Sequence, residues 1–466
     1  MTKHYFIYPN GGHSKMLAHN LDLLGHSYTF LDDFKESMSL ESNLKFIKDN
    51  GGGGSMSNPI LLACDSLCQE SIELKDKLRT KVENLGLACE DGFIYIMDEL
   101  NSYIKSATNP KNKTLGLHMY GRVDKRYSSL YLNSISGKLN IVYIFSTYDE
   151  LNNNKSLNNT FAMPFEHIKY LNSLQIILST TNKTSDGKIL LSLNHKIIVM
   201  AHAYTFPNGY LAYDDINSKY KKCAIKFNIN ENMPYILVSS KTNYQMAMDY
   251  FKELYGYETN KFIKAGYPPL DENIKNYEAI KKQTPDTILL ATRSKRVLHL
   301  LKPVASKLLN LGYKLHFRPH PQDCGHKEFQ DFASEFENIE NFTIDMNYKG
   351  IKQSKFSMDT LSKMICIVTD YSSFAYTLPI TNLRPAILFY PDTILQKCLE
   401  EKINNKIYKF NDDRLHIVAK TGNEVLYAVQ NLNLEEWEKK ILDYRNDEIY
   451  NIKNSSKFIA EFITNL

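Results

Sequence analysis

The chain has 466 residues, of which 43% are hydrophobic and 23% are charged, and its formal net charge is +4. This composition excludes an intrinsically disordered or fibrous protein, and the small net charge gives no indication of a nucleic-acid partner. No apolar run reaches the length of about 18 residues that spans a bilayer, and the cysteines are scattered, which favours a reducing compartment. We therefore expect a cytoplasmic protein, and a chain of this length predicts two domains.

Short runs rich in Ile, Val, Phe and Tyr alternate with helical segments along the chain. This alternation predicts parallel sheets with crossover helices, and therefore an α/β protein with two Rossmann-like domains. In the first half we expect strands at 4–8, 59–63, 92–97, 115–120, 141–145, 174–179 and 197–201. In the second half we expect strands at 235–239, 287–291, 314–318, 365–369 and 386–390. Helices are expected at 295–311, 434–444 and 455–463.

The predicted domains divide at residue 220, giving an N-terminal domain of residues 1–220 and a second domain of residues 221–440. The polar stretch 214–231 is the expected connection, and the C-terminal helix at 441–466 can pack back across the boundary. Residues 51–55 read Gly-Gly-Gly-Gly-Ser, the composition of a flexible loop. Its origin stays open between an engineered replacement, a natural loop and a translated guanine tract.

Polar residues follow the first strand, where residues 8–15 read Tyr-Pro-Asn-Gly-Gly-His-Ser-Lys. Two glycines here are only part of the dinucleotide-binding fingerprint, which makes that interpretation weak. His13 either contacts a substrate or acts as a base, or it belongs to a tight turn. The carboxylate pairs Asp32-Asp33 and Asp214-Asp215 are of a type that binds Mg²⁺, but each is more simply a solvated turn, so we expect no metal site.

The most informative segment is 315–321, which reads Leu-His-Phe-Arg-Pro-His-Pro. Proline ends a strand and fixes the backbone, so we expect His320 at the carboxyl end of a strand, where open α/β sheets bind ligands. An imidazole there can donate a hydrogen bond to a phosphate oxygen, and Arg318 can add a charge-assisted one. The alternative is a structural strand end with an incidental histidine.

A second segment, 365–375, contains a buried strand followed by Asp370, Tyr371, Ser372 and Ser373. These residue types cap a helix start, and a helix start favours an anion. Taken alone, the segment is as easily explained by a cap. Its spacing from His320, about fifty residues, corresponds to one or two βα units of a single sheet, which places both segments at the same edge.

Five short segments recur in an order that is specific as a set. They are Gly266-Tyr267-Pro268 with Asp271, the run 288–293, Arg318-Pro319-His320-Pro321, the run 369–373, and Arg384-Pro385 with the run 388–390. In this order they resemble the CDP-glycerol glycerophosphotransferase family, which includes teichoic acid polymerases and related capsule polymerases. The resemblance covers roughly residues 260–395. It implies a GT-B fold with two domains facing a central cleft, a CDP-linked donor bound in the second domain, and transfer without a catalytic metal.

The same resemblance implies residue roles. The donor pyrophosphate would be held by His320, Ser372 and Ser373, supported by Asp370 and Arg384, with Gly266, Thr292 and Arg293 of the other matching segments as further donor-binding residues. The family carries a histidine followed by glycine as its general base. The nearest candidate is His202, but Ala203 stands where glycine is expected. His13 is the second candidate, because the loop after the first strand faces the interdomain cleft in a GT-B protein.

The reaction implied by these residues starts from a CMP or CDP leaving group that gains negative charge, which His320 and its neighbours would neutralise. We expect a nucleotide-linked donor, a glycan or lipid-linked acceptor, and no cofactor. Two alternatives stay open: a glycosyltransferase that uses a CMP-activated acidic sugar, and a non-catalytic nucleotide or glycan binder. A short basic face that touches the inner surface of the cytoplasmic membrane is also left open, and the sequence does not set the oligomeric state.

Overall fold

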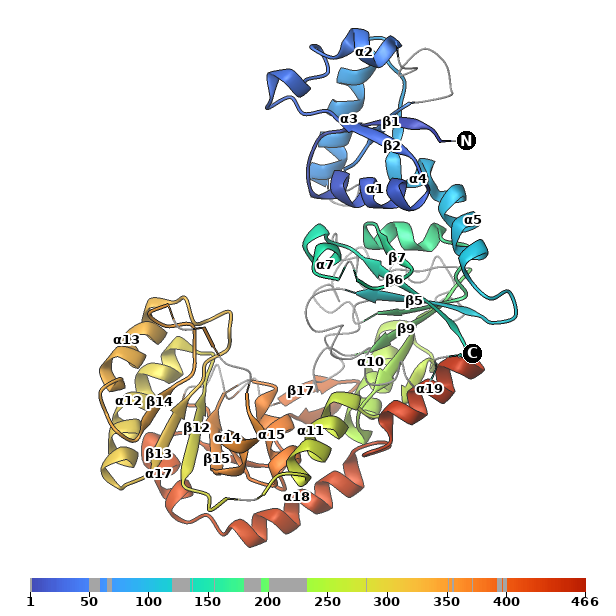
Figure 1. Ribbon diagram of the computed structural model, residues 1–466. Coiled ribbons are helices and arrows are strands. Elements are labelled where there is room, and N and C mark those ends of the chain that lie inside the picture. The colour runs from blue at the N-terminus through green and yellow to red at the C-terminus, as the bar shows by residue number, and fades with distance from the viewer. Residues whose placement is uncertain are drawn as a thin grey trace.

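The computed structural model describes residues 2–49, 59–64, 69–119, 135, 137–154, 156–179, 194–200, 233–281, 283–350, 352–353, 356–370, 372–391, 396 and 400–466. These residues form three parallel sheets and one antiparallel hairpin. The three sheets follow one another along a bent molecule (Figure 1). One buried core joins the first two sheets, and the third sheet has a core of its own.

The first sheet has the strand order β2-β1-β3-β4. Its strands are β1 (His4–Tyr8), β2 (Ser27–Phe30), β3 (Ile60–Leu62) and β4 (Cys89–Asp91). Helix α1 (Gly12–Leu23) packs between this sheet and strand β7 (Thr160–Ala162) of the next one. The carboxamide of Asn20 exchanges two hydrogen bonds with the backbone of Ala162, at 2.7 and 3.0 Å. A helix therefore covers the edge strand of the second sheet, whose backbone groups would otherwise lack a partner.

The second, middle sheet has the order β11-β10-β9-β8-β5-β6-β7. Its strands are β5 (Thr114–Met119), β6 (Asn140–Phe145), β7 (Thr160–Ala162), β8 (Ile176–Ser179), β9 (Lys196–Met200), β10 (Tyr235–Val238) and β11 (Phe262–Lys264). From β5 the chain first builds the sheet outward through β6 and β7, and it then continues on the other side of β5. The order of the strands thus reverses between β5 and β8, which is the pattern of a Rossmann-like sheet.

The third sheet has the order β14-β13-β12-β15-β16-β19 and also reverses, between β12 and β15. Its strands are β12 (Thr287–Ala291), β13 (Lys314–Phe317), β14 (Phe342–Ile344), β15 (Met364–Thr369), β16 (Ala386–Phe389) and β19 (His416–Ala419). The helices around it include α12 (Lys295–Asn310), α13 (Lys327–Phe336), α15 (Phe374–Asn382) and α17 (Gly422–Gln430).

The sheets divide the chain differently from the predicted boundary at residue 220. Strand β10 pairs with β9, and β11 pairs with β10, so the segment 235–264 belongs to the middle sheet. The first 200 residues also hold strands of two sheets where one was expected. A parallel strand carries no mark of its neighbour in the sequence, because its partner is reached through a long crossover. The predicted connection 214–231 and the loop 51–55 lie outside the described residues.

The strand expected at 92–97 is helical in the structure, where α4 (Gly92–Tyr95) leads into α5 (Met97–Ala107). The carboxylate of Asp91 accepts hydrogen bonds from the backbone N–H groups of Phe93 and Ile94, at 3.1 and 3.2 Å. This cap starts a helix. A short apolar run does not by itself distinguish a strand from a buried helix, which explains the error.

Two segments join the third sheet to the middle one. The hairpin of β17 (Glu400–Ile403) and β18 (Lys406–Lys409) lies against α10 (Lys241–Tyr255). There Asp249 accepts hydrogen bonds from the Lys406 ammonium, at 2.7 Å, and from the Tyr408 hydroxyl.

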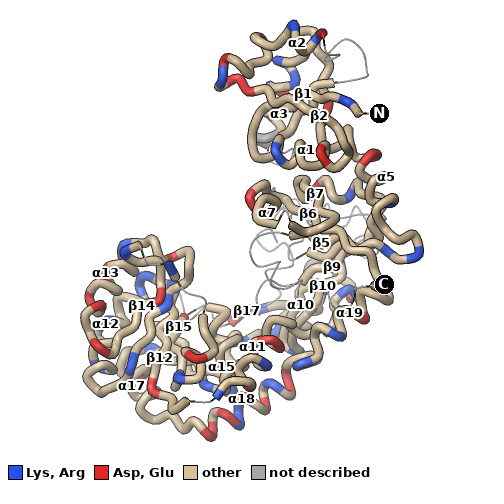
Figure 2. The backbone as a smooth tube through the Cα atoms, viewed as in Figure 1, with Lys and Arg blue, Asp and Glu red and all other residues tan. Residues whose placement is uncertain are grey.

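The end of the chain makes the second connection. Helix α18 (Leu434–Glu448) packs on α15, and α19 (Ser455–Asn465) continues to the middle sheet, where Phe462 packs edge-on against Tyr235 (Figure 1). Charges of both signs are interspersed over all three sheets in the view of Figure 2. Among the described residues, no helix has both the length and the apolar character needed to cross a bilayer.

Candidate functional site

Three neighbouring strands of the third sheet end side by side, and polar residues follow each of them. Strand β12 lies between β13 and β15 and is parallel to both. Arg293 follows β12, His320 follows β13, and Ser372 follows β15. This edge is also the point at which the strand order reverses, where open α/β sheets bind ligands. The prediction that His320 and Ser372 share one edge of one sheet is therefore met by the strand pairing.

The carboxylate of Asp370 joins the ends of β15 and β12. It accepts hydrogen bonds from the Thr292 hydroxyl at 2.6 Å, from the Ser294 backbone N–H at 2.7 Å and from the Arg293 backbone N–H at 3.0 Å. Burial raises the pKa of this carboxyl, and the hydrogen bonds oppose that rise. Asp370 and Thr292 are fully buried. The structure therefore places both in a clamp that fixes the turn before α12, rather than against a donor.

His320 is held in a tight turn after the strand. Its Nδ1 accepts the backbone N–H of Gln322 at 3.3 Å, and its carbonyl oxygen accepts the backbone N–H of Asp323 at 2.9 Å. Burial lowers the pKa of the imidazole, the positive charge of Arg293 lowers it further, and Asp323 acts in the opposite direction. The imidazole is thus neutral near pH 7, and because Nδ1 accepts, its proton resides on Nε2.

Ser372 is oriented in a similar way. Its Oγ accepts the backbone N–H of Phe374 at 3.3 Å, which leaves the hydroxyl proton to be donated elsewhere. Ser373 is the N-cap of α15, but its side chain makes no capping hydrogen bond. The backbone N–H groups of Ala375 and Tyr376 bond to the carbonyls of these two serines, at 3.0 and 3.1 Å. The donors offered by this turn are therefore hydroxyls more than backbone N–H groups.

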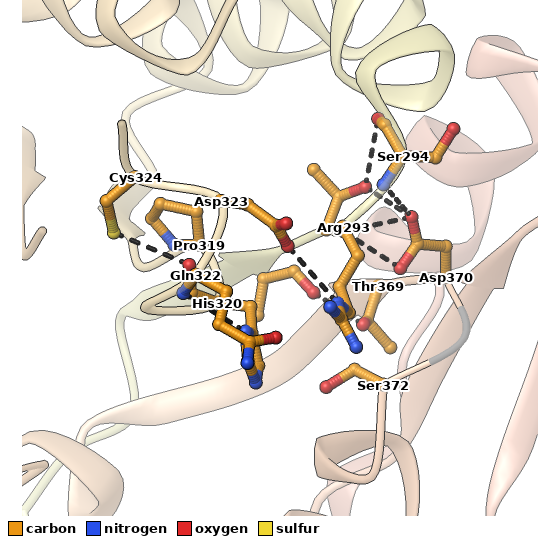
Figure 3. A network of polar contacts seen from close by, with 12 residues as sticks. Arg293, Ser294, Pro319, His320, Gln322, Asp323, Cys324, Thr369, Asp370 and Ser372 are labelled. Atoms are coloured by element: carbon orange, nitrogen blue, oxygen red, sulfur yellow. Dashed lines mark hydrogen bonds and ion pairs between the residues drawn. The ribbon is translucent and has the colours of Figure 1, made fainter. Parts of the chain in front are cut away.

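The side chain of Arg293 lies between the two. In Figure 3 its guanidinium extends into the space between His320 and Ser372. Its Nε donates to the carboxylate of Asp323 at 3.1 Å, and about a third of its side chain is exposed. One cation and two proton-donating groups from three strand ends thus line one position, which suits a phosphate or another oxyanion.

Comparisons with known proteins show what the fold is similar to. No protein-family model matches the chain, and no curated protein matches it. Among solved structures, a variant of the wall teichoic acid polymerase TagF soaked with CDPG is similar, with a TM-score of 0.50 and 14% identity, over 85% of this chain and 98% of that chain. A Listeria monocytogenes protein assigned as a UDP-N-acetylglucosamine 2-epimerase has a TM-score of 0.50 and 9% identity, over 76% of this chain and 96% of that chain.

The chain has a GT-B fold. The predicted fold class is thereby confirmed, and the resemblance carried by the five segments is confirmed at the level of the fold.

Arg318 lies in a different place from the one expected. Its guanidinium forms an ion pair with Asp345, which follows β14, and it stacks at 5.0 Å from the ring centre of Phe356. Only 11% of the side chain is exposed. The strand alternation that directs His316 toward Asp345 directs Arg318 there as well. The structure thus pairs Arg318 with a carboxylate of the protein instead of aiming it at the position lined by His320.

Arg384 precedes β16 and therefore lies at the amino end of the sheet, since β16 is parallel to β15. Its guanidinium donates to the carbonyl of Leu383 at 3.0 Å and lies 3.6 Å from the carboxylate of Glu438 on α18. The opposite edge of the same sheet holds His320 and Ser372. The expected support of the pyrophosphate by Arg384 does not agree with this placement.

Gly266 has a structural role in the fold. It has φ +83°, and a Cβ at this position would lie 2.2 Å from the Ser455 hydroxyl. The neighbouring Tyr267 N–H donates to that hydroxyl at 3.0 Å, and Asp271 accepts the N–H of Ser455 at 2.8 Å. The Gly-Tyr-Pro-Pro-Leu-Asp segment therefore packs against the start of α19 and fixes it by hydrogen bonds. The structure does not bring Gly266 to the donor position.

The two candidates for the general base, His202 and His13, both belong to the first half of the chain. His202 lies outside the described residues. His13 is in the first turn of α1, and α1 lies apart from the third sheet in Figure 1. The structure therefore does not bring His13 together with His320.

Of the two carboxylate pairs considered as metal ligands, the structure describes Asp32-Asp33. Asp33 pairs with Lys81 at 2.9 Å, and the second pair lies outside the described residues. Within the part of the chain that the structure describes, no group of three or more His, Cys, Asp or Glu residues is placed to hold a metal ion.

Sequence reasoning missed two polar groups. The first is Asp323, which holds Arg293. Its only signal in the sequence is that it is an acidic residue soon after the proline-bracketed His320. His118 on β5 occupies the reversal point of the middle sheet, where its two ring nitrogens lie 2.8 Å from the hydroxyls of Ser146 and Ser179. No motif surrounds it, since a single histidine in an apolar strand gives no functional signal.

Proposed function

We propose that this protein is a transferase that moves a phospho-polyol or related group from a CDP-activated donor to a cell-surface glycan acceptor, such as a capsule, a teichoic-acid-like polymer or a lipooligosaccharide. The pair His320 and Ser372 supports this proposal. Each accepts a backbone N–H at 3.3 Å, and each therefore has a proton to donate to the oxygens of a pyrophosphate. The CDPG soaked into the TagF structure makes a cytidine-linked donor the first choice.

In the proposed reaction, an acceptor hydroxyl oxygen attacks the outer phosphorus of the donor. A new P–O bond forms, the P–O bond to CMP breaks, and CMP leaves with the electron pair. Nε2–H of His320, the Ser372 hydroxyl and the Arg293 guanidinium would stabilise the charge that develops on the leaving phosphate. The acceptor proton passes to a base, for which His202 stays our candidate. Because these side chains supply the donors and the positive charge, we propose that no catalytic metal is required.

A donor screen tests this proposal. The protein is incubated with CDP-glycerol, with CMP-activated acidic sugars or with UDP-N-acetylglucosamine, in the presence of a glycan extract, and released nucleotide and product mass are measured. We expect CMP release from a CDP-linked donor, a product heavier by the transferred group, and no loss of rate in EDTA. Turnover of UDP-N-acetylglucosamine alone would contradict the proposal, and binding of cytidine nucleotides without any release would identify a non-catalytic binder.

A glycosyltransferase that uses a CMP-activated acidic sugar is the second candidate. His320 and Ser372 would contact the phosphate of the leaving group and not the group that is transferred, so they serve a CMP-sugar equally well. In the same screen, release of CMP from a CMP-sugar but not from CDP-glycerol would favour this candidate. A lipid-linked acceptor, presented at the inner face of the cytoplasmic membrane, fits either reaction.

A further inference from the structure

The turn that carries His320 is closed by Asp323. The backbone N–H of Asp323 bonds to the carbonyl of His320 at 2.9 Å, and its carboxylate accepts Nε–H of Arg293 at 3.1 Å. Only 15% of the Asp323 side chain is exposed. One residue therefore fixes the histidine turn through its backbone and the neighbouring cation through its side chain (Figure 3).

The charged groups around His320 have opposite effects on its imidazole. Arg293, from the turn after β12, lowers the imidazole pKa, and Asp323, from its own turn, raises it. Other charged side chains that the structure describes at these strand ends have partners of their own: Asp370 bonds to the turn at 292–294, and Arg318 pairs with Asp345. Burial lowers the imidazole pKa most, and the balance between one guanidinium and one carboxylate adjusts how readily the imidazole takes up a second proton.

We propose that Asp323 is a positioning residue for the donor phosphate: it holds Arg293 beside the His320 turn, where the guanidinium charge disfavours a second proton on the imidazole, and its carboxylate limits that effect. This inference rests on the proposed transferase function, in which Nε2–H donates to the leaving phosphate. A second proton would have to bind Nδ1, which accepts the Gln322 N–H, so protonation would open the turn. The device therefore couples the charge state of the histidine to its orientation.

The test is the titration of His320 by NMR of the imidazole nitrogens in the full chain. Asp323→Asn keeps the backbone N–H but removes the carboxylate charge, and we expect the His320 titration to move to lower pH. Arg293→Gln removes the opposing cation, and we expect it to move to higher pH. Asp323→Glu should restore the wild-type titration. Opposite shifts require opposing charges at the imidazole, whereas a purely structural role predicts no such pair of signs.

A matched control is Asp286→Asn, which breaks the ion pair with Lys314, 2.6 Å long, at the amino end of the same strands. It should leave the His320 titration unchanged. A titration that does not move in either Asp323→Asn or Arg293→Gln, or moves the same way in both, overturns the inference. If circular dichroism shows that one of these variants is unfolded, the direction of the His320 titration shift in the other variant still tests the inference.

The acidic limb of kcat/KM against pH gives the second readout, and it should follow the NMR shift in each variant. Opposite NMR shifts in a protein that turns over no donor would contradict the proposed function while supporting the positioning role. Turnover of a CDP-linked donor in a protein whose variants leave the His320 titration unmoved would support the proposed function and contradict the positioning role. The two proposals can therefore fail separately.

Discussion

The strand order of the middle and third sheets reverses in the same way, yet the histidines at their two reversal points are in different states. On the middle sheet, His118 is 2% exposed, stacks on Phe165 at 4.2 Å, and has a hydroxyl 2.8 Å from each ring nitrogen. On the third sheet, His320 is half-buried, and within the part of the chain that the structure describes its Nδ1 accepts the N–H of Gln322. The first histidine is part of the packing, and the second lies in a turn beside Arg293 (Figure 3).

The difference follows from where each histidine lies along its strand. His118 is inside β5, whose six residues are all buried, so its ring packs between the ends of the neighbouring strands. His320 comes three residues after the end of β13, and the two flanking prolines keep the strand from continuing. A topological reversal point therefore offers a position for ligands, but the local chain decides whether the position is filled by protein or left to a substrate.

The largest effect should come from removing His320, the proposed donor to the leaving phosphate. His320→Ala removes the Nε2–H donor to the leaving phosphate, and we expect the turnover found in the donor screen to fall by about a hundredfold to a thousandfold. His326→Ala is the matched control, because His326 is an exposed histidine of the same connection. Full activity of His320→Ala, measured as CMP release by the folded variant, would remove the proposed mechanism.

The buried histidine should show itself in stability instead. Burial lowers the pKa of His118 to about 3, from 6.5. Below pH 6.5 the unfolded chain therefore binds a proton that the folded chain does not, so the free energy of unfolding falls as the pH falls from 6.5 toward 3. The slope is about 1.4 kcal/mol per pH unit for one group.

Denaturant unfolding at pH 7 and pH 5 measures this slope. His118→Gln keeps a polar side chain but cannot take up a proton, so we expect a shallower dependence of stability on pH than in the wild type. His416, whose pKa burial lowers to about 4, still contributes in both proteins. An equal slope in the variant and the wild type would show that the imidazole of His118 is not held neutral by the fold.

Ser372 should have a smaller effect than His320, because a water molecule can replace a small hydroxyl as a donor more readily than it can replace an imidazole. Loss of one hydrogen bond to a charged phosphate corresponds to about 1.5–3 kcal/mol, so we expect Ser372→Ala to lower kcat/KM for the donor by roughly tenfold to a hundredfold. Ser306→Ala, on the exposed face of α12, is the control. An unchanged kcat/KM would mean that the hydroxyl donates elsewhere.

The ends of the two strands that precede His320 and Ser372 could be predicted from the sequence, for a physical reason. An apolar run that meets two prolines must end there, and an apolar run followed by Asp and Ser must turn into a helix, so both strand ends of the third sheet were placed correctly. The helix expected at 295–311 is found as Lys295–Asn310 for a similar reason, since its apolar spacing is regular.

What the sequence did not reveal depends on contacts between distant segments. The close packing of Gly266 against Ser455, and the pairing of β10 with the middle sheet, bring together residues that no local pattern connects. The direction of a side chain is equally hidden. Arg318 and His320 are two residues apart, yet one pairs with Asp345 and the other lies beside Arg293.

The smallest effect is expected at Arg384, and it sharpens the contrast between the two edges of the third sheet. Arg384 lies at the amino end of β16, so Arg384→Gln should change the affinity for a cytidine nucleotide by less than about twofold, as measured by calorimetry. Its guanidinium is 13% exposed and lies near Glu438 of α18, so its loss should instead lower the unfolding midpoint by removing a partly buried contact. A large loss of nucleotide affinity in a variant with unchanged stability would mean that the phosphate binds at the amino edge, and that the edge of His320 and Ser372 is not the donor site.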